Sequence, residues 1–296
     1  MKTLKFMLAA ATAIGLTTAS QAGVFPGSTN FEDLNAGAVT ISGFFQFDGA
    51  EGDNESEIIG ESVSFAGACG RPYTYAGTAD SKYLKVSTGE APLLCKLNSA
   101  SEGQAVGSGI YIDTLVQFTV TPSTDDVTTN AADKLLIYLK ENGAGSTNLY
   151  VKAAKYVAAY EEDGDEYPEV LEPHDVMVTN SVVAGEWYRL TVESSVVKDD
   201  NDADLLIFKI KLNGNPLSIL SVDGGNADPL YGESYDVFPS LLGRASTRLV
   251  SVGFAGEGCV DDLAMTTVNP FNPTIDFTLT LGSSTARSCK RCAVGR

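Results

Sequence analysis

The sequence is poor in the side chains on which most hydrolytic and transition-metal chemistry depends. It contains one histidine, His174, which lies beside Pro173 in the acidic stretch 160–175. A Ser-His-Asp or Cys-His arrangement would have to use that single imidazole. No serine has a nucleophile-elbow context, and no glycine-rich phosphate loop precedes a helix. These absences argue against most nucleophilic and nucleotide chemistry.

Basic residues and long apolar runs are also scarce. Lys and Arg number 20 against 38 Asp and Glu, which gives a formal net charge of −18. An acidic surface repels nucleic acid and anionic membranes and attracts cations. No stretch after the amino terminus is apolar enough to span a bilayer. The sequence therefore predicts no nucleic-acid partner and no membrane span.

The amino terminus has the pattern of a secretory signal peptide. Lys2 and Lys5 precede an apolar run over 6–16 and the small-residue stretch "TTASQAG". This pattern predicts cleavage after Ala22 and removal of residues 1–22. Cleavage removes two lysines and no acidic residue, so the net charge shifts from −18 to −20. We expect a secreted protein, extracellular or periplasmic.

An odd number of cysteines remains in the exported chain. Export permits disulfides. Cys69 and Cys95 flank one segment, and we predict that they pair with each other. Cys259 is then either a small buried hydrophobe or the partner of a tail cysteine, Cys289 or Cys292.

Apolar and polar residues alternate with a period of two along most of the chain, and helical periodicity is absent. In 204–212, leucine, phenylalanine and isoleucine share one face while two lysines share the other, and 186–194 alternates in the same way. About a dozen such runs, separated by turn signals, predict an all-β fold, an antiparallel β-sandwich or jelly roll.

The composition divides the mature chain in two. Residues 23–271 are expected to form the β-sandwich. The proline-bounded "NPFNPT" then leads into 272–296, which is basic and contains two cysteines. This segment is either a short tail or the truncated start of a second β domain.

Five segments, taken in order along the chain, resemble the concanavalin A-like lectin/glucanase superfamily, especially its LamG-like and MAM-like jelly rolls. They are "NFEDLNAG" (30–37), "YLKV" (83–86), "EWYRLTV" (186–192), "FKIKLNGNPL" (208–217) and "VGFAGEGCVDDLAM" (252–265). The resemblance implies a jelly roll of the concanavalin A-like type, whose first and last strands lie side by side.

The resemblance also implies a structural calcium ion. Its ligands would be an acidic residue of the opening motif, Glu32 or Asp33, and the first residue of the closing pair, Asp261. Calcium prefers several hard oxygen ligands, and a carboxylate within an apolar strand is costly unless it is neutralised. The alternative is that Asp261 and Asp262 lie at a frayed strand end and point into water.

A literal match to the carboxylate motif of the superfamily's glycosidases occurs at Glu161, Asp163 and Glu166. Retaining hydrolysis needs two carboxyl groups about 5–5.5 Å apart on a rigid element. The match contains a glycine and lies among many other acids and two prolines. We interpret it as a solvated acidic loop rather than an active site.

A face of tyrosine and lysine is the best indication of ligand binding. In the hairpin 134–156, any register that groups the apolar residues brings Tyr138 beside Tyr150 or Lys152, with Tyr156 on the same face. Such a face suits a sugar, but cross-strand tyrosine pairing that only stabilises the sheet is the alternative.

Together these patterns favour a secreted jelly-roll module that binds carbohydrate, a polysaccharide or glycan, or mediates cell-surface or matrix adhesion, without catalysis of its own. The alternatives are a glycoside hydrolase related to the family's glucanases and a purely structural surface protein. No feature of the sequence distinguishes one glycan from another, and the acidic surface argues only against strongly anionic ones.

Overall fold

The computed structural model describes most of the region between the predicted signal peptide and the predicted tail. The described residues are 23–39, 41, 45–47, 49, 53–61, 70–75, 80–88, 91–97, 104–107, 109–119, 135–141, 147–157, 159–162, 165–167, 170–179, 181–199, 202–223, 225–240 and 247–271. The segments 1–22 and 272–296 lie outside them, so the structure does not address the predicted cleavage or the tail.

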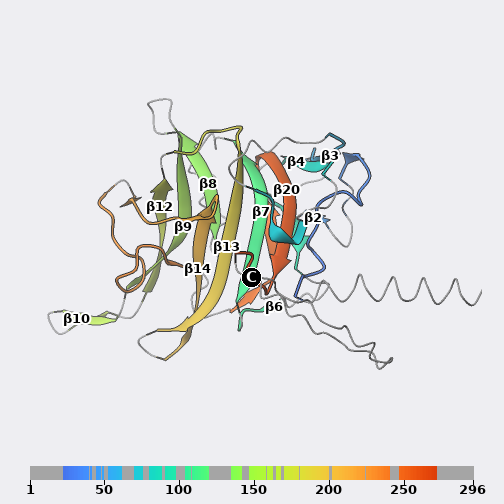
Figure 1. Cartoon of the computed structure of the whole chain (residues 1–296). Helices are drawn as coiled ribbons and strands as arrows, with labels where there is room; N and C mark the ends of the chain where they lie inside the picture. The colour runs from blue at the N-terminus through green and yellow to red at the C-terminus, as the bar shows by residue number, and fades with distance from the viewer. Residues whose placement is uncertain are drawn as a thin grey trace, which may run out of the picture.

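One large antiparallel sheet, sheet A, forms the centre of the molecule (Figure 1). Within the described residues its strands run in the order β1 (Gly37–Ala38), β3 (Glu57–Ile59), β4 (Tyr83–Ser87), β20 (Glu257–Thr266), β7 (Ile110–Phe118), β13 (Trp187–Lys198), β14 (Asp204–Leu212) and β15 (Asn215–Pro216), and β17 (Phe238–Pro239) also pairs with β14.

The second layer consists of smaller antiparallel sheets. Sheet B has the order β16 (Ser221–Val222), β12 (Val170–Thr179), β9 (Thr147–Val157) and β8 (Leu136–Glu141), and a three-stranded sheet has the order β19 (Ser251–Phe254), β5 (Leu93–Lys96) and β2 (Phe45–Phe47). Two further pairs are β18 (Arg248–Leu249) with β6 (Gln104–Ala105) and β10 (Tyr160–Glu162) with β11 (Asp165–Tyr167), and a 3-10 turn, η1, spans Tyr73–Tyr75.

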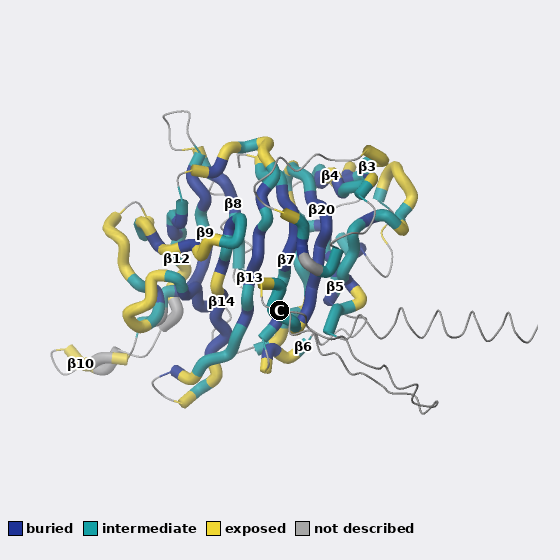
Figure 2. The backbone as a smooth tube through the Cα atoms, viewed as in Figure 1, coloured by how far each residue is buried: buried dark blue, intermediate teal, exposed yellow. Residues whose placement is uncertain are grey.

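The core lies between sheet A and the second layer, and the predicted alternation determines which residues enter it. Tyr188, Leu190 and Val192 of β13 pack in one cluster with Leu149 and Val151 of β9. In Figure 2 the central strands are dark blue and the peripheral loops yellow. The prediction of an all-β antiparallel sandwich is confirmed. The opposite face of β13, which carries Arg189 and Glu193, is therefore the outer face of sheet A.

The acidic stretch 160–175 contains more regular structure than the sequence predicts. It forms the hairpin β10–β11, in which Glu161 lies opposite Glu166, and the first half of β12. Glu161 is exposed, as expected of a solvated segment, while Asp163 lies outside the described residues. Pro173 is tolerated within β12 because β16 pairs with that strand only at Val176 and Met177, so that among the described strands position 173 lies on an edge.

The predicted Cys69–Cys95 disulfide is not supported. Cys95 is a free thiol within β5, fully buried in the core, and Cys69 lies outside the described residues. Burial raises the pKa of the Cys95 thiol to about 12, so it behaves as a small hydrophobe. Cys259 is also a free thiol and is only partly buried.

In the part of the chain that the structure describes, no helix combines the length and apolar character needed to cross a membrane.

Candidate functional site

Strand β20 exchanges one of its neighbours halfway along its length. Its first residues, from Glu257 to Val260, pair with β4. Beyond the exchange, the amino-terminal segment takes the place of β4: Thr29 bridges to Leu263, and the Phe25 amide donates to the Met265 carbonyl at 2.8 Å. The two ends of the described chain thus lie side by side, as the resemblance implies. Asp261 and Asp262 lie between the part of β20 that pairs with β4 and the part that pairs with the amino-terminal segment. We call this point, where β4 and the amino-terminal segment diverge beside β20, the fork of sheet A.

A β-bulge gives this pair its unusual position. The pairing of β20 with β7 shifts between Asp261 and Ala264, and Asp262 has a φ of 50°. This left-handed conformation is uncommon outside glycine, although Asp tolerates it better than most residues. Only 1% of Asp261 and 0% of Asp262 is exposed. The alternative of a frayed strand end pointing into water is therefore wrong.

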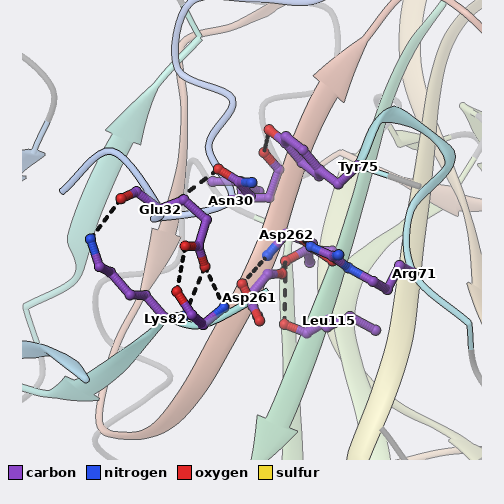
Figure 3. A network of polar contacts seen from close by, with 11 residues as sticks. Asn30, Glu32, Arg71, Tyr75, Lys82, Leu115, Asp261 and Asp262 are labelled. Atoms are coloured by element: carbon purple, nitrogen blue, oxygen red, sulfur yellow. Dashed lines mark hydrogen bonds and ion pairs between the residues drawn. The ribbon is translucent and has the colours of Figure 1, made fainter. Parts of the chain in front are cut away.

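Asp262 is paired with an arginine that is distant in sequence. Arg71 donates from Nε to Oδ2 at 2.5 Å and from a terminal nitrogen to Oδ1 at 2.6 Å. This two-point hydrogen bond raises the pKa of Arg71. The hydroxyl of Tyr75, from η1, donates to the Leu263 carbonyl at 2.9 Å (Figure 3). The segment 70–75 is thus attached to the bulge at two successive residues, Asp262 and Leu263.

Asp261 is only partly satisfied. Its Oδ1 accepts the Asp262 amide at 2.7 Å, while its Oδ2 is buried without a hydrogen-bond partner. Burial, followed by the neighbouring charge of Asp262, raises the pKa of Asp261 to about 8. The charge of Asp80 acts in the same direction, and Asp80 Oδ1 is also buried and unpartnered. Three carboxylates and one arginine leave an excess of negative charge that a proton or a cation must offset.

Glu32 lies beside the fork, but its oxygen atoms are already occupied. They accept the Ser81 amide at 2.5 Å, the Ser81 hydroxyl at 2.6 Å and the Lys82 amide at 2.8 Å. Burial alone would raise the pKa of Glu32, but these hydrogen bonds lower it. Lys82 in turn donates to the Glu32 carbonyl at 2.6 Å (Figure 3). Glu32 thus ties the amino-terminal segment to the start of β4.

The fork meets the requirements of a calcium site in part. No three Asp, Glu, His or Cys side chains among the described residues form a ready metal cluster. Asp261 has a bare, buried oxygen, Glu32 is engaged, and Asp33 is exposed. Asp80 supplies the second bare oxygen, and sequence reasoning missed it, although it lies only three residues before the "YLKV" strand. Calcium completes its shell with backbone carbonyls and water, so two carboxylates can suffice.

The outer face of sheet A carries a second polar cluster, which sequence reasoning also missed. Asp113 is 0% exposed. Its carboxylate accepts hydrogen bonds from Arg189 Nε at 2.9 Å, from a terminal nitrogen of Arg189 at 2.5 Å and from the Thr191 hydroxyl at 2.7 Å. Nearby, the Tyr111 hydroxyl donates to Glu193 at 3.2 Å. The alternation of 186–194 places Arg189, Thr191 and Glu193 opposite the core, and this was the signal available for them; it says nothing of Tyr111 and Asp113 on β7.

Aromatic and cationic side chains extend this outer face. The Tyr83 and Trp187 rings meet edge to face with centroids 5.9 Å apart. Lys85 and Lys209 are exposed and Lys211 is half-buried. This face therefore combines rings with hydrogen-bond donors.

The predicted tyrosine-lysine face is formed in sheet B but is largely covered. Tyr138 lies opposite Tyr150, and their rings stack with centroids 5.8 Å apart. Tyr138 is only 8% exposed and Lys152 only 7%, which leaves little of either for a ligand. The hairpin therefore shows the alternative of a cross-strand tyrosine pair, Tyr138 with Tyr150, that packs within the sheet. The side chain of Tyr156 lies outside the described part of the structure.

Comparison with known proteins gives distant structural similarities only. No protein-family profile matches the chain, and no curated protein sequence is significantly similar to it. An alginate lyase variant in complex with an alginate trisaccharide superposes over 83% of this chain and 99% of its own, at 12% identity and a TM-score of 0.35. An endo-β-1,4-glucuronan lyase from the fungus Trichoderma reesei covers 79% and 95%, at 14% identity and a TM-score of 0.33. A Chlorella virus alginate lyase covers 80% and 90%, at 10% identity and a TM-score of 0.27. All three are polysaccharide lyases by name. These similarities are too distant to define the fold, which rests on the chain's own strand order and core.

Proposed function

We propose that this chain is an exported jelly-roll module that holds one calcium ion at the fork of sheet A and binds carbohydrate on the outer face of that sheet. It has no catalysis of its own. The observation that carries the proposal is the pair of buried, unpartnered carboxylate oxygens of Asp80 and Asp261.

A calcium ion there would neutralise the charge that the protein leaves uncompensated. Asp80 and Asp261 would hold it, and Glu32 would keep the amino-terminal segment in place through Ser81 and Lys82. An ion bound only by the folded state stabilises it by about 2.7 kcal/mol at a hundred times its dissociation constant. The segment 24–34, β4 and β20 would then be tied together at one point.

We expect chelator to lower the melting temperature by about 5–10 °C, since that loss of free energy corresponds to such a shift in a domain of this size. Asp261→Asn should melt at the same temperature with and without calcium. In chelator it should be no less stable than the parent, because it removes a buried charge and its amide oxygen can still accept the Asp262 amide. Asp33→Asn, at an exposed position, is the matched control and should keep the full calcium response. If neither calcium nor chelator changes the melting temperature of the parent protein, this expectation is contradicted.

The outer face of sheet A is the better of the two candidate carbohydrate faces. Carbohydrate sites combine apolar surface with a few placed polar groups. Lys211, Arg189 and Tyr111 offer such groups and are each partly exposed, whereas Tyr138 and Lys152 on sheet B are buried. The carboxylates of this face are held in place, Asp113 by Arg189 and Glu193 by Tyr111.

We propose that the chain has no catalysis because its one histidine lies away from the proposed carbohydrate face. The single imidazole, His174, lies in β12 of sheet B with its Nδ1 2.6 Å from Asp223 Oδ2. It therefore belongs to a different sheet from the polar outer face of sheet A. No arrangement on that outer face pairs a nucleophile with an imidazole.

A glycan array probed at millimolar calcium should show binding, and mixed polysaccharides should release no reducing ends. Lys211→Ala should weaken binding by about tenfold, the effect of losing one charged hydrogen bond. Lys140→Ala is its counterpart on sheet B, where the ammonium lies over the Tyr150 ring, and it should bind like the parent. If Lys140→Ala weakens binding and Lys211→Ala does not, the carbohydrate site lies on sheet B instead. Released reducing ends would favour the alternative of a glycoside hydrolase.

A further inference from the structure

After Thr266 the chain leaves β20 and crosses the outer face of sheet A. The Thr267 amide donates to the Gly23 carbonyl at 2.8 Å, and the Asn269 side chain is hydrogen-bonded to Tyr111 of β7. The Phe271 amide then donates to Asn269 Oδ1 at 2.9 Å. We call residues 267–271 the strap. It starts at β20 and reaches β14, with β7 and β13 between them (Figure 1).

The strap ends with an aromatic ring placed on two cations. The Phe271 ring centroid is 4.7 Å from the Arg189 guanidinium carbon and 4.5 Å from Lys211 Nζ. Beneath it is a small hollow lined by Tyr111, Thr191, Glu193, Lys209, Lys211 and Phe271. With Phe271 in this position, the hollow has no room for a water molecule.

The two cations under the ring differ in whether they have an ion-pair partner. Arg189 is paired with Asp113 through Nε and one terminal nitrogen. Lys209, two residues before Lys211 on β14, contacts Asp236 at 3.2 Å. Lys211 has no ion-pair partner in the part of the chain that the structure describes, and the Phe271 ring is its contact. A ring is a weak partner for a cation at a partly exposed site, whereas a carboxylate would form a charge-assisted hydrogen bond.

We propose that Phe271 is a displaceable plug over a subsite that binds the carboxylate of a uronic acid residue through Lys211 and Arg189. This inference rests on the proposed carbohydrate function of sheet A and adds to it the class of sugar and the segment that competes with it. A neutral sugar offers no charge to Lys211. The acidic protein repels a polyanion at long range, but salt at physiological strength screens that repulsion beyond about 8 Å, and the local cations act at contact.

The plug is held weakly, and its removal should therefore be measurable as a gain in affinity. Phe271 is 39% exposed, and its ring is anchored by cation–π contacts rather than by burial in the core. A ligand must displace the ring before it reaches Lys211. Phe271→Ala should therefore bind the ligand more tightly than the parent does.

The test is calorimetric titration with a β-(1→4)-linked glucuronate hexamer and with the cello-oligosaccharide of equal length, which differs only in the oxidation of C6. We expect the parent to prefer the glucuronate hexamer, and Phe271→Ala to bind it about tenfold more tightly. Phe271→Tyr retains a ring and is the matched control, with parental affinity. Lys211→Ala should lose the preference for the charged hexamer. Unchanged affinity in Phe271→Ala overturns the plug, and so does weaker binding, because the ring would then be part of the site.

A second readout separates the plug from the carbohydrate function. Acetylation of lysines by an activated ester, followed by peptide mass spectrometry, should label Lys211 several-fold faster in Phe271→Ala than in the parent. Exposed Lys85 is the internal reference and should be labelled equally in both. If no oligosaccharide binds any variant, the carbohydrate function and the ligand are both wrong. If the hexamer binds but Lys211 is labelled at the same rate in both proteins, the function stands and the plug is overturned.

Discussion

Replacing Arg71 by leucine should lower the free energy of unfolding by about 3–5 kcal/mol, the usual effect of removing one partner of a buried ion pair. Asp262 is 0% exposed and would lose both hydrogen bonds from the guanidinium. It would also keep Asp261 as a like-charged neighbour. Urea unfolding monitored by tryptophan fluorescence provides the measurement.

Two further variants identify the cause of that loss. Lys85→Leu removes a cation whose partner, Glu57, is solvent-exposed, and we expect a change of no more than about 0.5 kcal/mol. The double variant Arg71→Leu with Asp262→Asn should recover part of the loss, because the stranded charge is gone. A single variant Arg71→Leu that unfolds within about 1 kcal/mol of the parent would show that Asp262 does not need its partner.

Arg189→Leu should have an effect of similar size, about 3–5 kcal/mol, because Asp113 is the second fully buried carboxylate that relies on an arginine. Thr191 would remain as its hydrogen-bond donor at 2.7 Å, but a hydroxyl does not neutralise the charge. The same unfolding experiment applies, and it is independent of any ligand. Lys209→Leu, two residues before Lys211 on the same outer face, is the control and should change stability by no more than about 0.5 kcal/mol.

The outcome that contradicts this expectation is equally specific. If Arg189→Leu and Lys209→Leu lose the same small amount of free energy, Asp113 is not held as a charged group by its arginine. Asp113→Asn in the Arg189→Leu background should restore stability if the pairing is as the structure has it.

The faces of the long strands could be predicted because side-chain alternation depends only on the strand itself. The stretches 186–194 and 204–212 show this: the alternating apolar set of each, Tyr188 to Val192 and Leu206 to Leu212, enters the core, and Arg189, Glu193 and the two lysines lie on the outer face of sheet A. The adjacency of 24–29 and β20 could also be expected, but only through the resemblance of "NFEDL" and "CVDDL" to a known family.

The partners of the buried charges could not be predicted in the same way. Arg71 and Asp262 are 191 residues apart, and nothing in local sequence links them. The bulge after Asp261 interrupts the alternation of β20, so period-two reasoning cannot place the side chains of Asp261 and Asp262. The resemblance gave a role only to Asp261, whereas Asp262 anchors the segment 70–75. Asp80 was missed because its role depends on where β4 leaves β20.

Local composition also led to a wrong prediction for 160–175, which was interpreted as an acidic loop. Its many acids suggest a loop, yet Tyr160 lies opposite Tyr167 in a hairpin, and Val170 and Leu171 begin β12. Pairing with β9 along this stretch outweighs the unfavourable strand propensity of the acids and of Pro173. For the hairpin 136–157, alternation limited the partners of Tyr138 to two candidates, and the structure selects Tyr150.

The central claim is that the buried carboxylates at the fork of sheet A hold a cation, and calorimetric titration of calcium into the metal-free protein tests it most directly. We expect one binding event per chain, which Asp261→Asn and Asp80→Asn each abolish and Asp33→Asn leaves unchanged. No heat of binding in the parent protein, together with a melting temperature that calcium does not raise, would contradict the claim. A proton on Asp261 would then be what offsets the charge.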